Sequence, residues 1–296
     1  MFSILIPTYN NINYLKLCVE SLEKNSKLKH QIIIHINEGS DGTLNYVKEN
    51  KIDYTFSEKN IGMPKALNLA SKLIKKEYIL ISHDDFYYCP GWDIEFLDEI
   101  RKLPNNKFYL SGTMVGAGQV PFDAGETYLN FDEKKLLQNL DRIKTFNFQG
   151  TTKCPGLVHK DIWKLVGGWS EEFSPTGGDD TDFAMKLWKN NIRIFKGLGK
   201  SLAYHFGSIT TRKKDKKLFT YLGSRGNKIF LKKWGISINF FEKKFLNSGL
   251  DKNKNLIFNE YLSPLEEPNK NLSYYFELLQ LKILRFYLFF FYYIKF

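Results

Sequence analysis

Two adjacent aspartates, Asp84 and Asp85, end the apolar run of residues 78–82 and are the first candidates for chemistry in this sequence. A short run rich in Ile and Leu and bounded by charge is typical of a buried parallel strand. Both carboxylates would then lie at its carboxyl end, where open α/β sheets bind ligands. Such a pair can hold Mg²⁺ or Mn²⁺, and the cation can neutralise a substrate diphosphate. The alternative is a strand that ends in a solvated Asp-Asp turn.

A second acidic group, Asp179, Asp180 and Asp182, follows two glycines and precedes an amphipathic pattern over residues 183–188. The helix dipole favours carboxylates at a helix start, and their side chains can cap its amides, so a structural explanation exists for each of them. A carboxylate beside a substrate hydroxyl can also take up its proton as a general base. The two acidic groups can act on one substrate only if the fold brings them to one cavity.

Apolar segments that alternate with helical patterns predict the framework that positions these groups. Strands are expected at residues 2–6, 31–36, 52–56 and 78–82, with a helix after each of the first three. This alternation predicts an α/β fold with a mostly parallel central sheet, right-handed crossovers and helices on both faces. The loops at residues 7–10, 37–41, 60–65 and 83–85 should then meet along one edge.

The second half of the chain is less regular. We expect strands at residues 108–115, 154–159 and 202–208, helices at 160–166 and from 183, and a basic helix within 212–233. Residues 121–150 are polar and aromatic and are expected to form a lid or an acceptor-side loop.

The C-terminal segment, residues 274–296, is strongly aromatic, but Glu277, Lys282 and Arg285 interrupt it. A membrane-spanning helix needs about 20 mostly apolar residues. The pattern therefore predicts an amphipathic helix that lies on a membrane surface or packs on the main domain, and the mixture of aromatic and basic residues favours the membrane.

Composition restricts the partners and the compartment. The net charge of +11 predicts an acidic partner, either a nucleotide, a phospholipid surface or nucleic acid, and no nucleic-acid-binding motif accompanies the basic segment. The three cysteines form no Cys-x-x-Cys pair that would suggest a zinc or redox centre, and a cytoplasmic location fits them. The N-terminus has no basic region before its apolar run and is expected to be a strand.

Ordered motifs over about residues 2–235 resemble family 2 of the glycosyltransferases, an inverting group with the GT-A fold. Ile4-Leu5-Ile6-Pro7-Thr8-Tyr9-Asn10 is similar to the family's first strand and nucleotide loop. Asn37-Glu38-Gly39-Ser40-Asp41-Gly42-Thr43 is similar to its next element, shortened by one residue. Glu38 stands at the position of the Asp that recognises the base. The resemblance implies that Pro7, Thr8, Tyr9, Asn10, Glu38 and Asp41 contact the nucleotide.

Two further motifs resemble the donor site of the family. Asn60-x-Gly62-x-x-Lys65-x-x-Asn68 is similar to the region that borders the diphosphate and ribose. His83-Asp84-Asp85 occupies the Asp-x-Asp position, where one carboxylate meets the metal and one the ribose, and the order of the two is open.

The remaining motifs resemble the catalytic half. Gly167-Gly168-Trp169 followed by Gly178-Asp179-Asp180-Thr181-Asp182 is similar to the family's Gly-Gly-Phe and Glu-Asp-x-Asp elements. The resemblance implies that Asp180 is the catalytic base and that Trp169 and Asp179 line the substrate site. His205 is similar to the late histidine that completes the metal site with Asp84 and Asp85.

The resemblance implies a glycosyltransferase that uses Mn²⁺ or Mg²⁺. It would move a sugar from a nucleotide-diphosphate sugar, with UDP favoured, to a hydroxyl of a glycan or lipid-linked acceptor in surface polysaccharide synthesis. Residues 1–115 would form the nucleotide-sugar half, 116–235 the acceptor half and 236–296 a helical extension, in a cytoplasmic protein peripheral on the inner face of a membrane. The alternatives are an inactive GT-A protein that serves as a nucleotide-sugar-binding scaffold and, less favoured, a sugar nucleotidyltransferase, whose glycine-rich basic signature is absent after the first strand.

Overall fold

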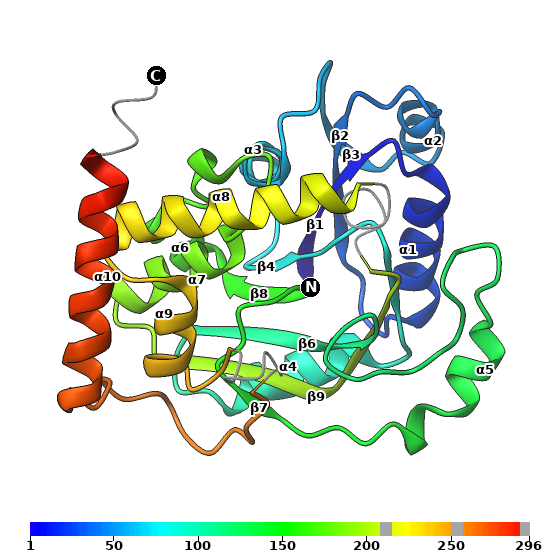
Figure 1. The fold of residues 1–296 in the computed structure, drawn as a ribbon. Coiled ribbons are helices and arrows are strands. Elements are labelled where there is room, and N and C mark those ends of the chain that lie inside the picture. The colour runs from blue at the N-terminus through cyan, green and yellow to red at the C-terminus, as the bar shows by residue number, and fades with distance from the viewer. Residues whose placement is uncertain (208–214, 250–256, 291–296) are drawn as a thin grey trace.

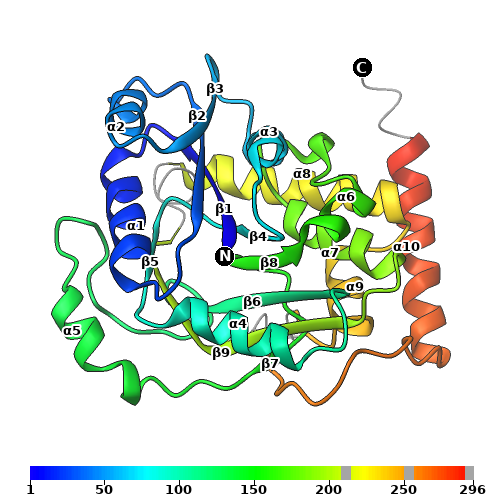
Figure 2. The same cartoon turned by 180° about the vertical axis from the view of Figure 1, so that it is seen from behind.

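A computed structural model describes residues 1–207, 215–249 and 257–290 of the chain (Figures 1 and 2). Parts of three expectations therefore lie outside the described residues. These are the end of the strand predicted at 202–208, the start of the basic segment at 212–214 and the last residues of the C-terminal segment, 291–296.

The first half folds as a parallel sheet, as predicted. Strands β1 (Phe2–Tyr9), β2 (Gln31–Asn37), β3 (Asp53–Ser57) and β4 (Tyr78–Ile81) lie in the order β3-β2-β1-β4 and all pair in parallel. Helices α1 (Ile12–Asn25), α2 (Thr43–Glu49) and α3 (Met63–Ala70) make the crossovers, and a short 3₁₀ turn, Ser71–Leu73, ends the third. The central strands are continuous apolar runs because both faces of the sheet are covered.

The second half extends the same sheet with mixed pairing. The order continues β4-β8-β6-β9-β5, through β8 (Gly156–His159), β6 (Phe108–Gly116), β9 (Ile194–His205) and β5 (Phe86–Tyr88), and β7 (Phe148–Gln149) pairs with β9. Strand β8 is antiparallel to both neighbours, and β6 and β9 are parallel. The sheet is thus parallel on the side of β1 and mixed on the side of β9.

Helices and turns cover this second half. They are α4 (Trp92–Lys102), α5 (Glu133–Gln138), α6 (Lys160–Val166), α7 (Asp179–Lys189), α8 (Lys216–Trp234), and the 3₁₀ turns Leu140–Arg142 and Glu171–Phe173. Residues 121–150 are mainly loop, with α5 and β7 as their regular elements.

Helix α8 passes directly over the loop that precedes α7 (Figure 1). The backbone of Gly226 lies so close to the Gly177 carbonyl that no side chain fits between them. Two side chains from the end of α8 reach the buried Asp182, with the Trp234 Nε1 at 2.7 Å and the Lys233 Nζ at 3.0 Å. Asp182 therefore anchors α8 to α7.

The C-terminal extension has two parts that differ in burial. Helix α9 (Ile238–Lys244) inserts Phe240 and Phe241 into the same core as the sheet, and both are almost fully buried. Helix α10 (Leu272–Phe290) stands at the edge of the molecule, against the end of α8 (Figure 1). The Arg285 Nη2 donates to the Lys232 carbonyl at 2.7 Å, where α8 ends.

Candidate active site

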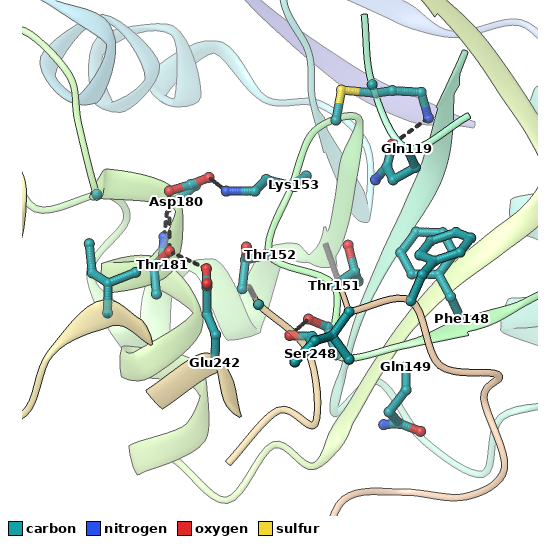
Figure 3. Close-up of a pocket in the computed structure, with 18 residues that line it drawn as sticks. Gln119, Phe148, Gln149, Thr151, Thr152, Lys153, Asp180, Thr181, Glu242 and Ser248 are labelled. Atoms are coloured by element: carbon teal, nitrogen blue, oxygen red, sulfur yellow. Dashed lines mark hydrogen bonds and ion pairs between the residues drawn. The ribbon is translucent and has the colours of Figure 1, made fainter. Parts of the chain in front are cut away.

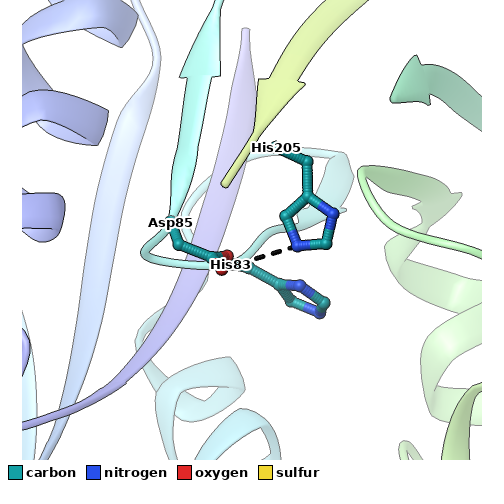
Figure 4. Close-up of side chains that lie close together, drawn as sticks. All are labelled: His83, Asp85 and His205. Carbon is teal, nitrogen blue, oxygen red and sulfur yellow. Dashed lines mark ion pairs between the residues drawn. The ribbon is translucent and has the colours of Figure 1, made fainter. Parts of the chain in front are cut away.

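Three side chains gather where β4 ends and β5 pairs with β9 (Figure 4). His83 and Asp85 lie in the turn between β4 and β5, and His205 is the last residue of β9. The pairing places Phe86 opposite His205, so sheet register brings His205 beside Asp85. One nitrogen of each imidazole and one carboxylate oxygen all lie within 4.8 Å of one another.

The hydrogen bonds of this cluster fit a divalent cation. The His205 Nδ1 is 2.8 Å from the Ala117 carbonyl, which can only accept, so this nitrogen donates the hydrogen bond. The other ring nitrogen, Nε2, lies 3.5 Å from the Asp85 carboxylate, and a proton or a cation between them would make this contact favourable. The His83 Nε2 is buried and has no hydrogen-bond partner among residues 1–207, 215–249 and 257–290. Burial lowers the pKa of His83 to about 4, so this imidazole is neutral near pH 7.

Asp84 lies outside this cluster. Its Oδ2 accepts a hydrogen bond from the Thr8 hydroxyl at 2.7 Å, which ties the end of β4 to β1. Burial and the nearby Asp85 charge raise the pKa of Asp84. The structure thus groups Asp85 and His205, two of the predicted metal ligands, and places His83 beside them where Asp84 was expected.

The predicted base-recognition residues form an exposed polar group at the ends of β1 and β2. The Glu38 Oε1 is 3.1 Å from both the Asn10 Nδ2 and the Ser40 hydroxyl. Tyr9 beside them is 37% exposed, and Pro7 lies further back in β1. This surface can receive a flat nucleobase.

Asp41 serves the framework. It accepts from the Ile12 amide at 2.8 Å and from the Thr43 hydroxyl at 2.7 Å, and so joins the starts of α1 and α2. Its two carboxylate oxygens are therefore both occupied by the protein.

The predicted diphosphate-binding loop contacts the acceptor half. Asn60 accepts from the Gly62 amide at 2.9 Å, and the Met63 amide donates to the Pro175 carbonyl at 2.8 Å. A side chain at Gly62 would overlap the backbone of Pro175, so glycine is needed there. Lys65 is exposed on the first turn of α3.

Asn68 and Trp169 form a brace between the two halves. The Asn68 side chain donates to the Trp169 carbonyl and accepts from the Trp169 amide, both at 2.9 Å. The Trp169 ring is 1% exposed and stacks on Phe183 at 5.9 Å. These contacts position the Gly-Gly-Trp turn and engage both ends of the Asn68 amide.

Asp180 lines a cavity of about 330 Å³ (Figure 3). Its Oδ1 accepts from the Thr181 amide at 2.8 Å, and its Oδ2 is 2.9 Å from the Lys153 Nζ. Burial raises the pKa of the Asp180 carboxyl, but the Lys153 charge and hydrogen bond outweigh it, and the pKa ends below its usual value. Asp180 is therefore a carboxylate, the form that can accept a proton.

The neighbours of Asp180 also line the cavity or support its loop. The Thr181 hydroxyl is 3.1 Å from a carboxylate oxygen of Glu242, which comes from α9. Asp179 accepts from the Gly177 amide at 3.0 Å and is buried, so it fixes the loop before α7. Burial and the Asp180 charge raise the pKa of Asp179.

The cluster of His83, Asp85 and His205 and the Asp180 cavity lie within electrostatic reach. The Asp180 charge raises the pKa of His83 against the larger effect of burial, and His83 in turn lowers the pKa of Asp180. His83 and Asp180, almost one hundred residues apart in the sequence, therefore lie near each other in the fold.

Sequence reasoning missed three residues of this region. His83 belongs to the quoted motif, but it was not considered as a ligand. Lys153 directly precedes the strand predicted at residues 154–159, and a lysine next to a conspicuous apolar segment gives no signal of its own. Glu242 comes from the extension, where no pattern indicated a site.

The parallel first half and the mixed second half of the sheet are the arrangement of the GT-A type glycosyltransferase fold. The Glycosyl transferase family 2 profile matches residues 3–160 of the chain. The chain thus belongs to glycosyltransferase family 2.

Individual relatives agree with this family. An uncharacterized glycosyltransferase of Rickettsia typhi is 37% identical over 203 residues, which cover 66% of this chain and 59% of the relative. The chondroitin synthase of Escherichia coli is 22% identical over 69% of this chain and 34% of its own length. The chain therefore spans less than two thirds of the length of these relatives.

Solved structures of TarS from S. aureus share the fold. TarS 1–349 superposes with a TM-score of 0.53 at 18% identity, over 77% of this chain and 68% of that one. Its complex with UDP-GlcNAc gives a TM-score of 0.50 at 18% identity, over 78% and 70%.

A search for membrane-crossing helices covered the three described stretches of the chain. Within them, no helix is both long enough and apolar enough to span a bilayer.

Proposed function

We propose that the chain is an inverting, metal-dependent glycosyltransferase that moves a sugar from a UDP-sugar to a hydroxyl of a glycan or lipid-linked acceptor. One observation carries the proposal: the Asp180 carboxylate lines a cavity, and Asp180 lies close enough to the cluster of His83, Asp85 and His205 for His83 and Asp180 to shift the pKa of each other. Residues 1–115 would bind the donor, and residues 116–235 would bind the acceptor.

The charges of the reaction match this arrangement. Breaking the bond between sugar and diphosphate develops negative charge on the leaving oxygens, which a cation held by His83, Asp85 and His205 would stabilise when bound. Asp180 would accept the proton of the acceptor hydroxyl as that oxygen attacks the opposite face of the sugar. Asp84, held by Thr8, would meet the ribose.

The polar group of Asn10, Glu38 and Ser40 supports a uracil-type base, because the Glu38 carboxylate can accept an N–H of the ring. The binding of UDP-GlcNAc by TarS, which shares the fold, favours the same nucleotide. On the acceptor side, the rings of Phe148 and Phe258 line the cavity with their centroids 4.6 Å apart and their planes tilted by 37°, so an acceptor sugar can lay its apolar face there. A surface polysaccharide is the product that we favour.

The direct test is a panel of nucleotide sugars with Mn²⁺, Co²⁺ or Mg²⁺, measured as release of the nucleoside diphosphate. We expect turnover of UDP-sugars that depends on added metal. Binding of UDP-sugars without any turnover would favour the scaffold alternative. Turnover that is unaffected by chelators would contradict the proposed metal dependence.

Lys153 should control the acid side of the pH profile. Replacing Lys153 with Met removes the largest pKa-lowering influence on Asp180, so the pKa of Asp180 should rise. Because Asp180 must be ionised to act as a base, the fall of kcat/KM at low pH should move to higher pH, by about one pH unit or more. Lys153→Arg keeps the charge and should keep the profile. An acid limb that stays in place in the Met variant would contradict the role of Lys153.

The exposed face of α10 supports a membrane contact. Large apolar side chains recur every three or four residues along one stripe and are 50–87% exposed: Leu272, Tyr275, Phe276, Leu279, Ile283, Phe286, Tyr287 and Phe290. We define these residues as the α10 stripe. A stripe of this composition beside Lys282 suits an anionic bilayer surface.

The contact can be measured by sedimentation with vesicles of phosphatidylcholine and phosphatidylglycerol. Phe276, Leu279 and Ile283 changed together to Glu should abolish cosedimentation, because apolar area is lost and negative charge is added. Glu at Ser273 and Gln280, exposed polar residues of the same helix, adds charge without removing apolar area and should reduce binding only slightly. Equal binding of the triple variant and the native chain would rule out the α10 stripe.

A further inference from the structure

We propose that His83 is a metal ligand and makes the cation site select Co²⁺ and Zn²⁺ over Mn²⁺, and Mn²⁺ over Mg²⁺. The inference concerns the metal of the proposed function. Its test measures metal binding alone, so that the metal selectivity and the proposed transfer reaction can each be contradicted separately.

The geometry of the rings supports a prepared site (Figure 4). The Phe86 ring stacks on the His83 ring at 5.1 Å with an interplanar angle of 12° and meets the His205 ring edge-on at 4.9 Å. One buried aromatic side chain thus holds both imidazoles. The two ring centroids are 6.1 Å apart, and the donor atoms of the cluster lie within 4.8 Å of one another.

A buried ring nitrogen of His83 without a hydrogen-bond partner among the described residues supports a role as a metal ligand. Its Nε2 is buried and unpartnered within the described part of the chain, and such a nitrogen costs free energy unless a ligand satisfies it. Two donors on one first-row ion are at most about 4.2 Å apart, because each bond is about 2.1 Å. Binding of a metal ion must therefore draw the three donor atoms closer together.

The donor set decides the selectivity. Two imidazole nitrogens and one carboxylate carry a single negative charge, whereas a second carboxylate at position 83 would double it. Mg²⁺ prefers oxygen ligands and depends on their charge, while Co²⁺ and Zn²⁺ form strong bonds to imidazole. Affinity should therefore follow the general order of divalent ions for nitrogen sites, with Mg²⁺ weakest.

The experiment is calorimetric titration of the full chain with Co²⁺, Zn²⁺, Mn²⁺ and Mg²⁺ chlorides, without any nucleotide sugar. The visible spectrum of bound Co²⁺ reports its nitrogen ligands. We expect Co²⁺ and Zn²⁺ to bind at least about tenfold more tightly than Mg²⁺. His83→Gln should weaken Co²⁺ and Zn²⁺ binding by about tenfold or more and change the Co²⁺ spectrum. His83→Asp, which supplies an oxygen, should lower the ratio of Co²⁺ to Mg²⁺ affinity.

His159→Gln is the matched control, because this histidine lies at the start of α6 and outside the cluster. It should leave all affinities unchanged. Circular dichroism shows whether each variant is folded. Two different substitutions at position 83 keep the test possible if one of the variants does not fold. Unchanged metal affinities in both His83 variants, or Mg²⁺ binding as tight as Co²⁺ in the native chain, would overturn the inference. That result would leave the proposed transfer reaction intact. Conversely, the metal selectivity would still hold if no nucleotide sugar were turned over.

Discussion

Asp180→Asn is expected to slow sugar transfer by about 10²- to 10⁴-fold, the usual contribution of a general base, with UDP binding unchanged. The amide has nearly the same shape but cannot take up a proton. The variant should fold, because the Lys153 side chain that loses its charge partner is 46% exposed and can be solvated. Single-turnover rates measure the loss, and a binding titration with UDP and metal tests the unchanged donor site.

Asp182→Asn is the contrasting control on the same helix. Asp182 is fully buried and contacts the Trp234 ring nitrogen and the Lys233 ammonium, so its loss should lower the melting temperature. The folded fraction should keep its turnover. If Asp180→Asn turned over at a near-native rate, Asp180 would not be the base. A large loss of turnover in folded Asp182→Asn would assign that role to Asp182.

Removing residues 236–296 is expected to unfold the whole chain, whereas removing only residues 272–296 should not. The longer deletion takes away Phe240, Phe241 and Leu246, which are at most 3% exposed. Truncating a buried Phe to Ala costs about 3–5 kcal/mol and a buried Leu about 2–5 kcal/mol, so the loss reaches the total stability of a domain, about 5–15 kcal/mol. Soluble expression and thermal melting measure the outcome.

The shorter deletion serves as the comparison. In α10 only Tyr274 is buried, so the remaining chain should stay folded and keep turnover with soluble acceptors, and should lose vesicle binding. A stable, active chain of residues 1–235 would show that the extension is a separate appendage, as the sequence suggested. Unfolding of both truncated chains would make α10 part of the core.

The parallel first half of the sheet could be predicted from the sequence because its signals are local. Its strands are short apolar runs between turn clusters, and the parallel order follows from their alternation with helices. The hydrogen bond from the Thr8 hydroxyl to Asp84 follows from that topology, because β1 and β4 are neighbours in the sheet.

In the second half, β6, β8 and α6 lie where the sequence predicted them, but the strand pairing resisted prediction because it is non-local. Strand β9 begins at Ile194, but Lys196, Gly197 and Gly199 interrupt its apolar pattern, so only its end was expected. Gly197 is required because the Phe148 ring from β7 lies against its backbone. Strand β5 has only three residues, too few to give a period, yet its pairing places His205 beside Asp85.

The hydrogen bond of Arg285 to the end of α8 has a consequence for how the molecule meets a flat surface. Helix α10 is fastened to α8, and α8 is fastened to α7, whose first turn carries Asp180, and to the loop that precedes it. Once the α10 stripe rests on a bilayer, the direction in which the cavity opens is set by the protein itself. An acceptor that diffuses laterally in the lipid would meet the base from a constant side, and a search in three dimensions becomes a search in two.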